Sequence, residues 1–128
     1  MSYYYARTVD MNFEQAIENV TSELQKEGFG VLTEIDVKAT LKKKLGVDFR
    51  PYRILGACNP GYAHPALLTE PHIGVMLPCN VVVQITENGQ TEVFVVDPAA
   101  AMQAVENAEL RSIALEIRDK LKAALDRL

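Results

Sequence analysis

One segment of this chain is almost free of charge. Between Ile54 and Thr86 the only formally charged residue is Glu70, although charged residues make up 23% of the chain. A stretch of this kind forms part of a core, a binding pocket or an interface between subunits. It is not expected to cross a membrane, because a spanning helix needs roughly 20 uninterrupted apolar residues. Glycine or proline interrupts the segment at Gly56, Pro60, Gly61, Pro65, Pro71, Gly74 and Pro78.

The length and composition predict one domain over residues 1–128. A chain of 128 residues with 48% hydrophobic content can bury roughly two thirds of the surface that its unfolded form exposes. The first residues do not resemble a signal peptide, because they lack a basic start and a continuous apolar run. We therefore expect a soluble protein in the cytoplasm. A net charge of -4 argues against a nucleic-acid partner or a membrane partner.

Hydrophobic periodicity predicts a mixed order of helices and strands. Asn12 and Gln15 form a capping box at the start of a helix that ends at Gly28. The Asn88-Gly89 pair predicts a tight hairpin, because this dipeptide supplies the positive φ angles of such a turn. Strands are expected over residues 3–9, 29–37, 52–58, 81–86 and 91–96, and a short helix over 38–45. Further helices follow Asp97-Pro98, with a break near Asn107.

This order favours an α+β fold: a small, mainly antiparallel sheet with helices packed on one face and a long C-terminal helix. The apolar stripe of that last helix is long and regular, so it is also a candidate dimer element. In the short helix, Val37, Leu41 and Leu45 are expected to face inward. The four lysines of this region are then solvated, and an anion-binding role for them is the alternative. These lysines are Lys38, Lys42, Lys43 and Lys44.

Several motifs together resemble the family called domain of unknown function 302. The resemblance implies a small α+β domain of bacterial or archaeal type, a homodimer, and no assigned reaction. Pro65 departs from the pattern, since it disfavours one continuous helix over residues 60–70. The principal motifs are Leu32-Thr33-Glu34-Ile35-Asp36-Val37, Tyr52-Arg53-Ile54-Leu55-Gly56-Ala57-Cys58-Asn59-Pro60, Leu77-Pro78-Cys79-Asn80-Val81-Val82-Val83 and Asp97-Pro98.

If the low-charge segment contains reactive groups, these are Cys58 and Cys79, two cysteines in similar sequence settings. Cys58 ends a strand, and Asn59 and Pro60 suit the start of a helix, whose free N–H groups stabilise a thiolate. Packing of Cys58 as a small buried side chain is the more ordinary interpretation. Cys79 begins a strand. The two thiols lie close together only if these strands are antiparallel neighbours. Gly56 lies two residues before Cys58. A glycine in a strand predicts that another group approaches the backbone closely or that a bulge occurs there.

The other polar groups of the segment give weaker signals. Asn59 and Asn80 each follow a cysteine, and either cap nearby backbone or bind a ligand. His64, His72 and Glu70 match no zinc-site spacing, so no metal and no cofactor are expected. Glu34 and Asp36 are most simply solvated, and Tyr62 and Met76 are most simply core. No nucleophile motif, phosphate loop or dinucleotide fingerprint occurs.

Three hypotheses of different classes follow. The favoured one is a homodimer with a small-molecule pocket near Cys58, Asn59, Cys79 and Asn80. The second is a thiol-based redox activity or a metal-dependent activity centred on Cys58 and Cys79. The third is a structural or interaction module in which the low-charge segment is only a dimer interface. Whether the protein is an enzyme stays open at this point.

Overall fold

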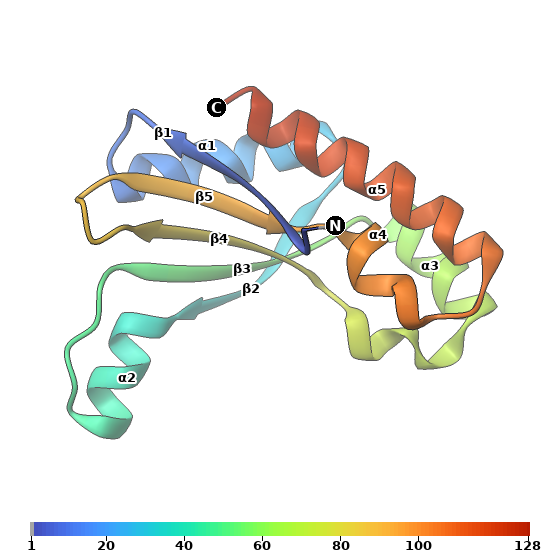
Figure 1. Ribbon diagram of the computed structural model, residues 1–128, viewed down its shortest axis with the longest axis horizontal. Coiled ribbons are helices and arrows are strands. Elements are labelled where there is room, and N and C mark those ends of the chain that lie inside the picture. Colours follow the sequence, from blue (N-terminus) through green and yellow to red (C-terminus); the bar gives the residue numbers. More distant parts are fainter. Residues whose placement is uncertain (1) are drawn as a thin grey trace.

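A five-stranded antiparallel sheet organises the protein, in the order β1-β5-β4-β3-β2. The structure is a computed structural model that describes residues 2–128. Each strand runs antiparallel to its neighbours. The edge strand β1 pairs with β5, which lies far from it in the sequence (Figure 1). The strands are β1 (Tyr4–Val9), β2 (Gly30–Asp36), β3 (Tyr52–Cys58), β4 (Cys79–Ile85) and β5 (Thr91–Val96).

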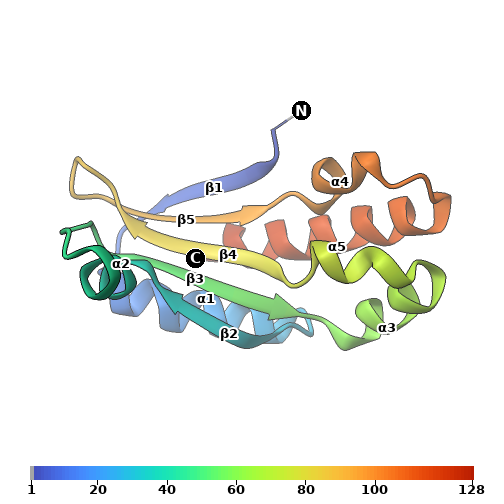
Figure 2. The ribbon, with the colours of Figure 1, turned by 90° about the horizontal axis from the view of Figure 1, so that it is seen from below.

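Two helices, α1 (Phe13–Lys26) and α5 (Ala108–Asp126), cover one face of this sheet (Figure 1). Seen from below, the five strands lie side by side with α1 and α5 behind them (Figure 2). The α+β prediction with a long C-terminal helix is therefore confirmed. The shorter elements are α2 (Val37–Leu45), α3 (Pro60–Thr69), the 3-10 segments η1 (Pro71–Met76) and η2 (Met102–Ala104), and α4 (Pro98–Ala101).

The core lies between the sheet and these two helices. Alternate strand residues point into it, among them Val81, Val83, Val93 and Val95, all at most 1% exposed. The apolar stripe of α5 packs against them, and Leu121 of that stripe is fully buried. The stripe is thus used inside the chain and does not support the expectation that this helix is a dimer element. Alternation also leaves a second set of strand side chains facing away from α1 and α5, and we call this side of the sheet the open face.

The ends of the helices follow the predicted capping chemistry. Asn12 and Gln15 form a reciprocal capping box, and Gly28 adopts φ +88° just after α1. Asp97 caps α4 through its side chain, and Asn107 caps α5 by accepting from the backbone N–H groups of the next turn. These side chains satisfy donors that the first turn of a helix leaves free.

The β4–β5 hairpin forms as predicted, but with a different turn. Only Gly89 has a positive φ, +78°, whereas Asn88 does not. The N–H of Gly89 donates to the carbonyl of Thr86 at 2.9 Å, and the N–H of Thr86 donates to the carbonyl of Gln90 at 2.8 Å. This is the longer type of loop in which a single glycine takes the left-handed conformation. The prediction of two positive φ angles was wrong.

Two helix predictions also need correction. In α2 no residue is fully buried: Val37 and Leu41 are half-buried and Leu45 is 70% exposed, so the expected inward stripe packs only in part. In contrast, α3 is continuous from Pro60 to Thr69 with Pro65 inside it. Proline removes one helical hydrogen bond, to the carbonyl of Gly61. Because Gly61 and Pro65 are both exposed, water can bond that carbonyl, and the helix continues.

Candidate functional site

The cysteines lie at one end of the sheet, where β3 finishes and β4 begins. Ala57 pairs with Cys79 across these antiparallel strands, so Cys58 and Cys79 lie close, as the antiparallel case required. Cys58, Asn59 and Cys79 line one cavity of about 30 Å³ together with apolar side chains such as Phe29 and Ile117. Asn80 is exposed, pairs with Gly56 and does not line the cavity.

Size and polarity limit what this cavity can do. About 30 Å³ is the space of one water molecule in the liquid, far below the volume of an organic ligand. Both cysteines are free. Burial, and then the neighbouring Cys58, raises the pKa of the Cys79 thiol to about 11. Cys79 is therefore a protonated, packed thiol at neutral pH, whereas Cys58 is half-buried.

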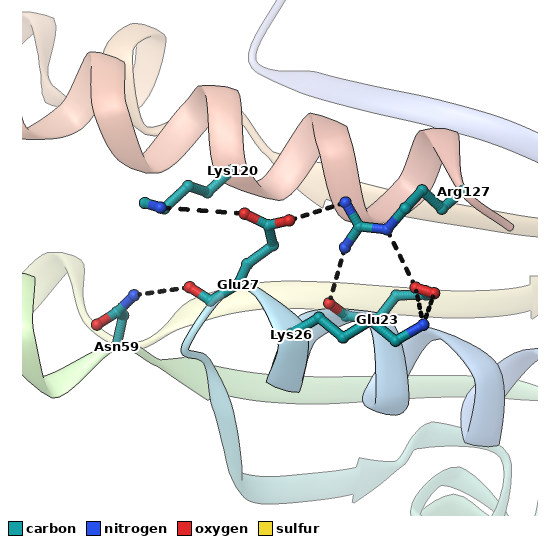
Figure 3. A network of polar contacts seen from close by, with 6 residues as sticks. All are labelled: Glu23, Lys26, Glu27, Asn59, Lys120 and Arg127. Atoms are coloured by element: carbon teal, nitrogen blue, oxygen red, sulfur yellow. Dashed lines mark hydrogen bonds and ion pairs between the residues drawn. The ribbon is translucent and has the colours of Figure 1, made fainter.

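Asn59 does not cap α3 through its side chain, although α3 begins beside it as expected. Its Nδ2 donates instead to the backbone carbonyl of Glu27 at 3.1 Å. Figure 3 shows that Glu27 also belongs to an ion-pair network, in which Arg127 Nη1 donates to Glu27 at 2.8 Å and Arg127 Nε to Glu23 at 3.1 Å. Asn59 thus ties the start of α3 to the end of α1.

The remaining candidates are not gathered into a site. His64 and His72 are exposed, and the His72 Nδ1 lies 3.6 Å from Glu70. Within residues 2–128 no three His, Cys, Asp or Glu side chains are arranged to hold a metal ion. Glu34 and Asp36 are not simply solvated, because both bind Arg53, at 2.5 and 3.5 Å.

The open face carries a continuous line of aromatic rings. Tyr3 and Tyr4 lie at its β1 edge, Phe94 on β5, and Tyr52 on β3 beside Phe49. Successive centroids, in the order Tyr3, Tyr4, Phe94, Tyr52, Phe49, are 5.0, 6.2, 6.2 and 6.0 Å apart. These are contact distances for tilted or edge-to-face rings. We call these five residues the ring row.

A chain of polar side chains runs beside the ring row. Arg50 Nε donates to Gln84 Oε1 at 2.8 Å, and Gln84 Nε2 donates to Glu92 Oε1 at 2.8 Å. The Arg50 guanidinium also lies over the ring of Phe49, 4.4 Å from its centroid, and 5.5 Å from that of Tyr52. Stacking and hydrogen bonding together hold this cation in one orientation.

Rings and polar chain enclose a groove of about 280 Å³. We call it the open-face groove, and its lining residues are Tyr3, Tyr4, Arg50, Tyr52, Gln84, Glu92 and Phe94. A larger hollow of about 460 Å³ lies between α4 and α5, where Arg111 is its one charged lining residue. The open-face groove is smaller but offers rings together with a cation, an amide and a carboxylate.

Comparison with known proteins places the chain in a family. The family model described as "Domain of unknown function DUF302" matches residues 5–128. The chain belongs to this family. Among solved structures, an uncharacterized conserved DUF302 protein from Bacillus stearothermophilus is 35% identical, with a TM-score of 0.92. The match covers 99% of this chain and 98% of that one. None of the curated proteins compared with the sequence matches it.

The resemblance inferred from the motifs is thus confirmed, and the DUF302 description names no reaction. Function has to be argued from the geometry of this DUF302 domain. In residues 2–128 no helix is long and apolar enough to span a membrane.

Sequence reasoning missed the groove of the DUF302 domain, although one signal for it was present. In β5, Glu92, Phe94 and Val96 alternate with the buried Thr91, Val93 and Val95. Alternation places a large ring on the face away from the helices. A half-buried phenylalanine that shares the outward face of a strand with Glu92 is the feature that would have drawn attention to this side of the sheet.

Proposed function

We propose that this domain is a binding module that holds a small molecule with a flat ring in the open-face groove. The ring row is the observation that carries the proposal. Five aromatic side chains from distant parts of the sequence meet on the sheet face that α1 and α5 leave uncovered. Aromatic faces of this kind stack on flat ligands, and a few fixed polar groups orient them.

The dimensions of the groove agree with a ligand of one ring or two fused rings. Its volume of about 280 Å³ lies near the lower end of the range for small-molecule sites. The groove is shallow, since Tyr3 is 72% and Tyr4 45% exposed. For a ligand of roughly a dozen heavy atoms, we expect a dissociation constant of about 0.1 to 1 mM.

Phe94→Leu is expected to weaken the binding of 3-phenylpropionate by about 2- to 10-fold, because one ring contact is worth roughly 0.5–1.5 kcal/mol. Leucine keeps an apolar side chain at the position, so the sheet is expected to stay folded. The measurement is an NMR titration that follows backbone amide shifts. The shift changes in the wild type are expected at β1, β3, β4 and β5 around the groove.

Leu32→Ala serves as the matched control, because Leu32 is 70% exposed on β2 and does not line the groove. It is expected to leave the affinity unchanged. Shift changes gathered around Cys58 and Cys79, or no binding by any ring compound, would contradict the proposed function.

A second candidate keeps the small-molecule site at Cys58, Asn59, Cys79 and Asn80. It is supported by the cavity that the first three of these residues share. The volume of about 30 Å³ suits a molecule of the size of water. An organic ligand would have to displace the side chains that close the cavity, such as Tyr62 and Pro78.

The thiol-based alternative makes a prediction about alkylation. With its pKa raised to about 11, Cys79 is roughly 0.01% thiolate at pH 7, so iodoacetamide is expected to leave it unmodified in the native protein. Cys58, which is half-buried, is the one thiol expected to react. Mass spectrometry of the peptides identifies the labelled residue. Unfolded protein, in which both thiols should react, is the control. Rapid labelling of native Cys79 near neutral pH would support a redox pair instead.

The proposed assembly is a homodimer formed by the exposed part of the low-charge segment. Leu68 is 73% and Val75 86% exposed, and Leu67 and Met76 about 40%, on the contacting elements α3 and η1. Single apolar side chains on a surface are ordinary, but a cluster marks an interaction site. The low charge of this surface suits contact with a second copy of itself. Sedimentation equilibrium tests the stoichiometry, and a Leu68→Glu/Val75→Glu variant is expected to be monomeric.

A further inference from the structure

The polar chain of the open-face groove keeps a cation and a carboxylate at a defined separation. Gln84 bonds Arg50 through its oxygen and Glu92 through its nitrogen, each at 2.8 Å. Within residues 2–128, no side chain or carbonyl accepts from Nη1 or Nη2 of Arg50, and no donor bonds the second carboxylate oxygen of Glu92. A ligand can therefore bind both charged groups without breaking the bonds that orient them.

We propose that the ligand is an α-amino acid with an aromatic side chain. Its carboxylate accepts from the guanidinium of Arg50, its ammonium group donates to Glu92, and its ring lies against Tyr52 and Phe94. This inference rests on the proposed function, because it assigns a chemical class to the ligand of the same groove.

The separation of the two charged groups fits one amino acid. Gln84 connects the two charged groups through two hydrogen bonds of 2.8 Å, and the oxygen and nitrogen of its amide are about 2.3 Å apart. Arg50 Nε and Glu92 Oε1 are therefore no more than about 8 Å apart. In an α-amino acid a carboxylate oxygen and the ammonium nitrogen are about 2.7 Å apart. A charge-assisted hydrogen bond of about 2.8 Å at each end gives a total of roughly 8 Å. The free Nη atoms of Arg50 and the second carboxylate oxygen of Glu92 belong to the same planar groups as Nε and Oε1, so an amino acid bound to them spans a comparable interval beside the Gln84 amide.

Charge gives the groove its selectivity. The two charged lining residues, Arg50 and Glu92, sum to zero, and so does a zwitterion. An aromatic acid without an amine would satisfy Arg50 but place its carboxylate near Glu92, and an aromatic amine would do the reverse. Unpaired or like charges of this sort are a common means of rejecting the wrong ligand.

The rings give the preference for an aromatic side chain. Tyr52 and Phe94 have their centroids 6.2 Å apart and tilted by 71°, so a third ring can contact the face of one and the edge of the other. Aliphatic amino acids would keep both ionic contacts but lose this stacking.

The test compares three probes that share a phenyl ring: L-phenylalanine, 3-phenylpropionate and phenethylamine. Glycine is the probe without a ring. L-Phenylalanine is expected to bind roughly 3- to 10-fold more tightly than either one-charge compound, because each exposed charge contact adds a modest amount. NMR titration supplies the dissociation constants. Glycine is expected to bind most weakly of the four.

Two variants then assign the charges. Glu92→Gln is expected to reduce the affinity for L-phenylalanine to that for 3-phenylpropionate, while leaving 3-phenylpropionate binding as tight or tighter. Arg50→Gln is expected to reduce L-phenylalanine binding to that of phenethylamine. Glu87→Gln, in the exposed hairpin turn outside the groove lining, is the matched control and should change none of these constants. Urea unfolding confirms that each variant is folded.

The outcomes separate this inference from the proposed function. If all three phenyl compounds bind equally in the groove, or if Glu92→Gln weakens all of them alike, the amino-acid assignment is overturned and the ring-binding function stands. If none of them binds, both are overturned. Tighter binding of L-phenylalanine that Glu92→Gln and Arg50→Gln each remove supports both.

Discussion

Leu121→Ala is expected to lower the free energy of unfolding by about 3 to 4 kcal/mol, as for other leucines in a packed core. Leu121 is fully buried on α5, where it packs with residues of the sheet and of α1. Truncation removes apolar contacts and leaves a cavity that the surrounding strands can fill only in part. Urea denaturation followed by circular dichroism measures the change.

Leu115→Ala is the matched control on the same helix, because Leu115 is 44% exposed. Its expected loss is below about 1 kcal/mol. The comparison also tests the assignment of the α5 stripe to the core of a single chain. If the decrease in the free energy of unfolding caused by Leu121→Ala disappears at low protein concentration, the helix packs against another subunit. The assignment of its stripe to the core of a single chain would then be wrong.

Gly56→Ala is expected to destabilise the protein by about 1 to 3 kcal/mol, the range for an extra methyl group in a crowded site. A Cβ atom at this position would lie 2.1 Å from Thr33 Oγ1 and 2.8 Å from Pro78 Cγ. Both distances are far inside van der Waals contact, so β2 or the segment before β4 has to move. The sequence predicted either a close approach or a bulge, and both occur, since the β2–β3 register shifts between Val31 and Thr33.

A double variant separates this clash from any general effect of alanine in a strand. Removing the Thr33 hydroxyl with Thr33→Ala should recover part of the stability lost in Gly56→Ala. Full recovery is not expected, because Pro78 stays in place. Gly30→Ala is the control, since no heavy atom lies within 4 Å of its added Cβ. Equal losses for Gly30→Ala and Gly56→Ala would show that close packing is not the cause.

Local features of the fold could be predicted because their causes are local. The capping box of Asn12 and Gln15 needs only residues three apart, and the β4–β5 hairpin needs only one turn and two alternating strands. The turn type was harder, because Asn88-Gly89 is compatible with more than one loop. The prediction for α2 was right only in part, since periodicity shows which residues share a helix face, but not how far another element covers it.

The candidate site could not be predicted in the same way. The lack of charge directed attention to residues 54–86, yet Arg50 and Glu92 of the open-face groove lie on either side of that segment. The rings come from three stretches of sequence that only the strand order β1-β5-β4-β3 brings together. Pairing of β1 with β5, which places Tyr4 beside Phe94, is a long-range event that no local pattern encodes.

The pairing of β1 with β5 also has a consequence during translation. Tyr4 leaves the ribosome long before its partner Val96, and at 5–20 residues per second this strand waits roughly 5 to 20 s. Until β5 is synthesised, β1 lacks the strand with which it pairs. Its aromatic side chains are then exposed to chaperones and to neighbouring chains. Slower synthesis between the two strands should therefore increase aggregation more than slower synthesis after α5 begins.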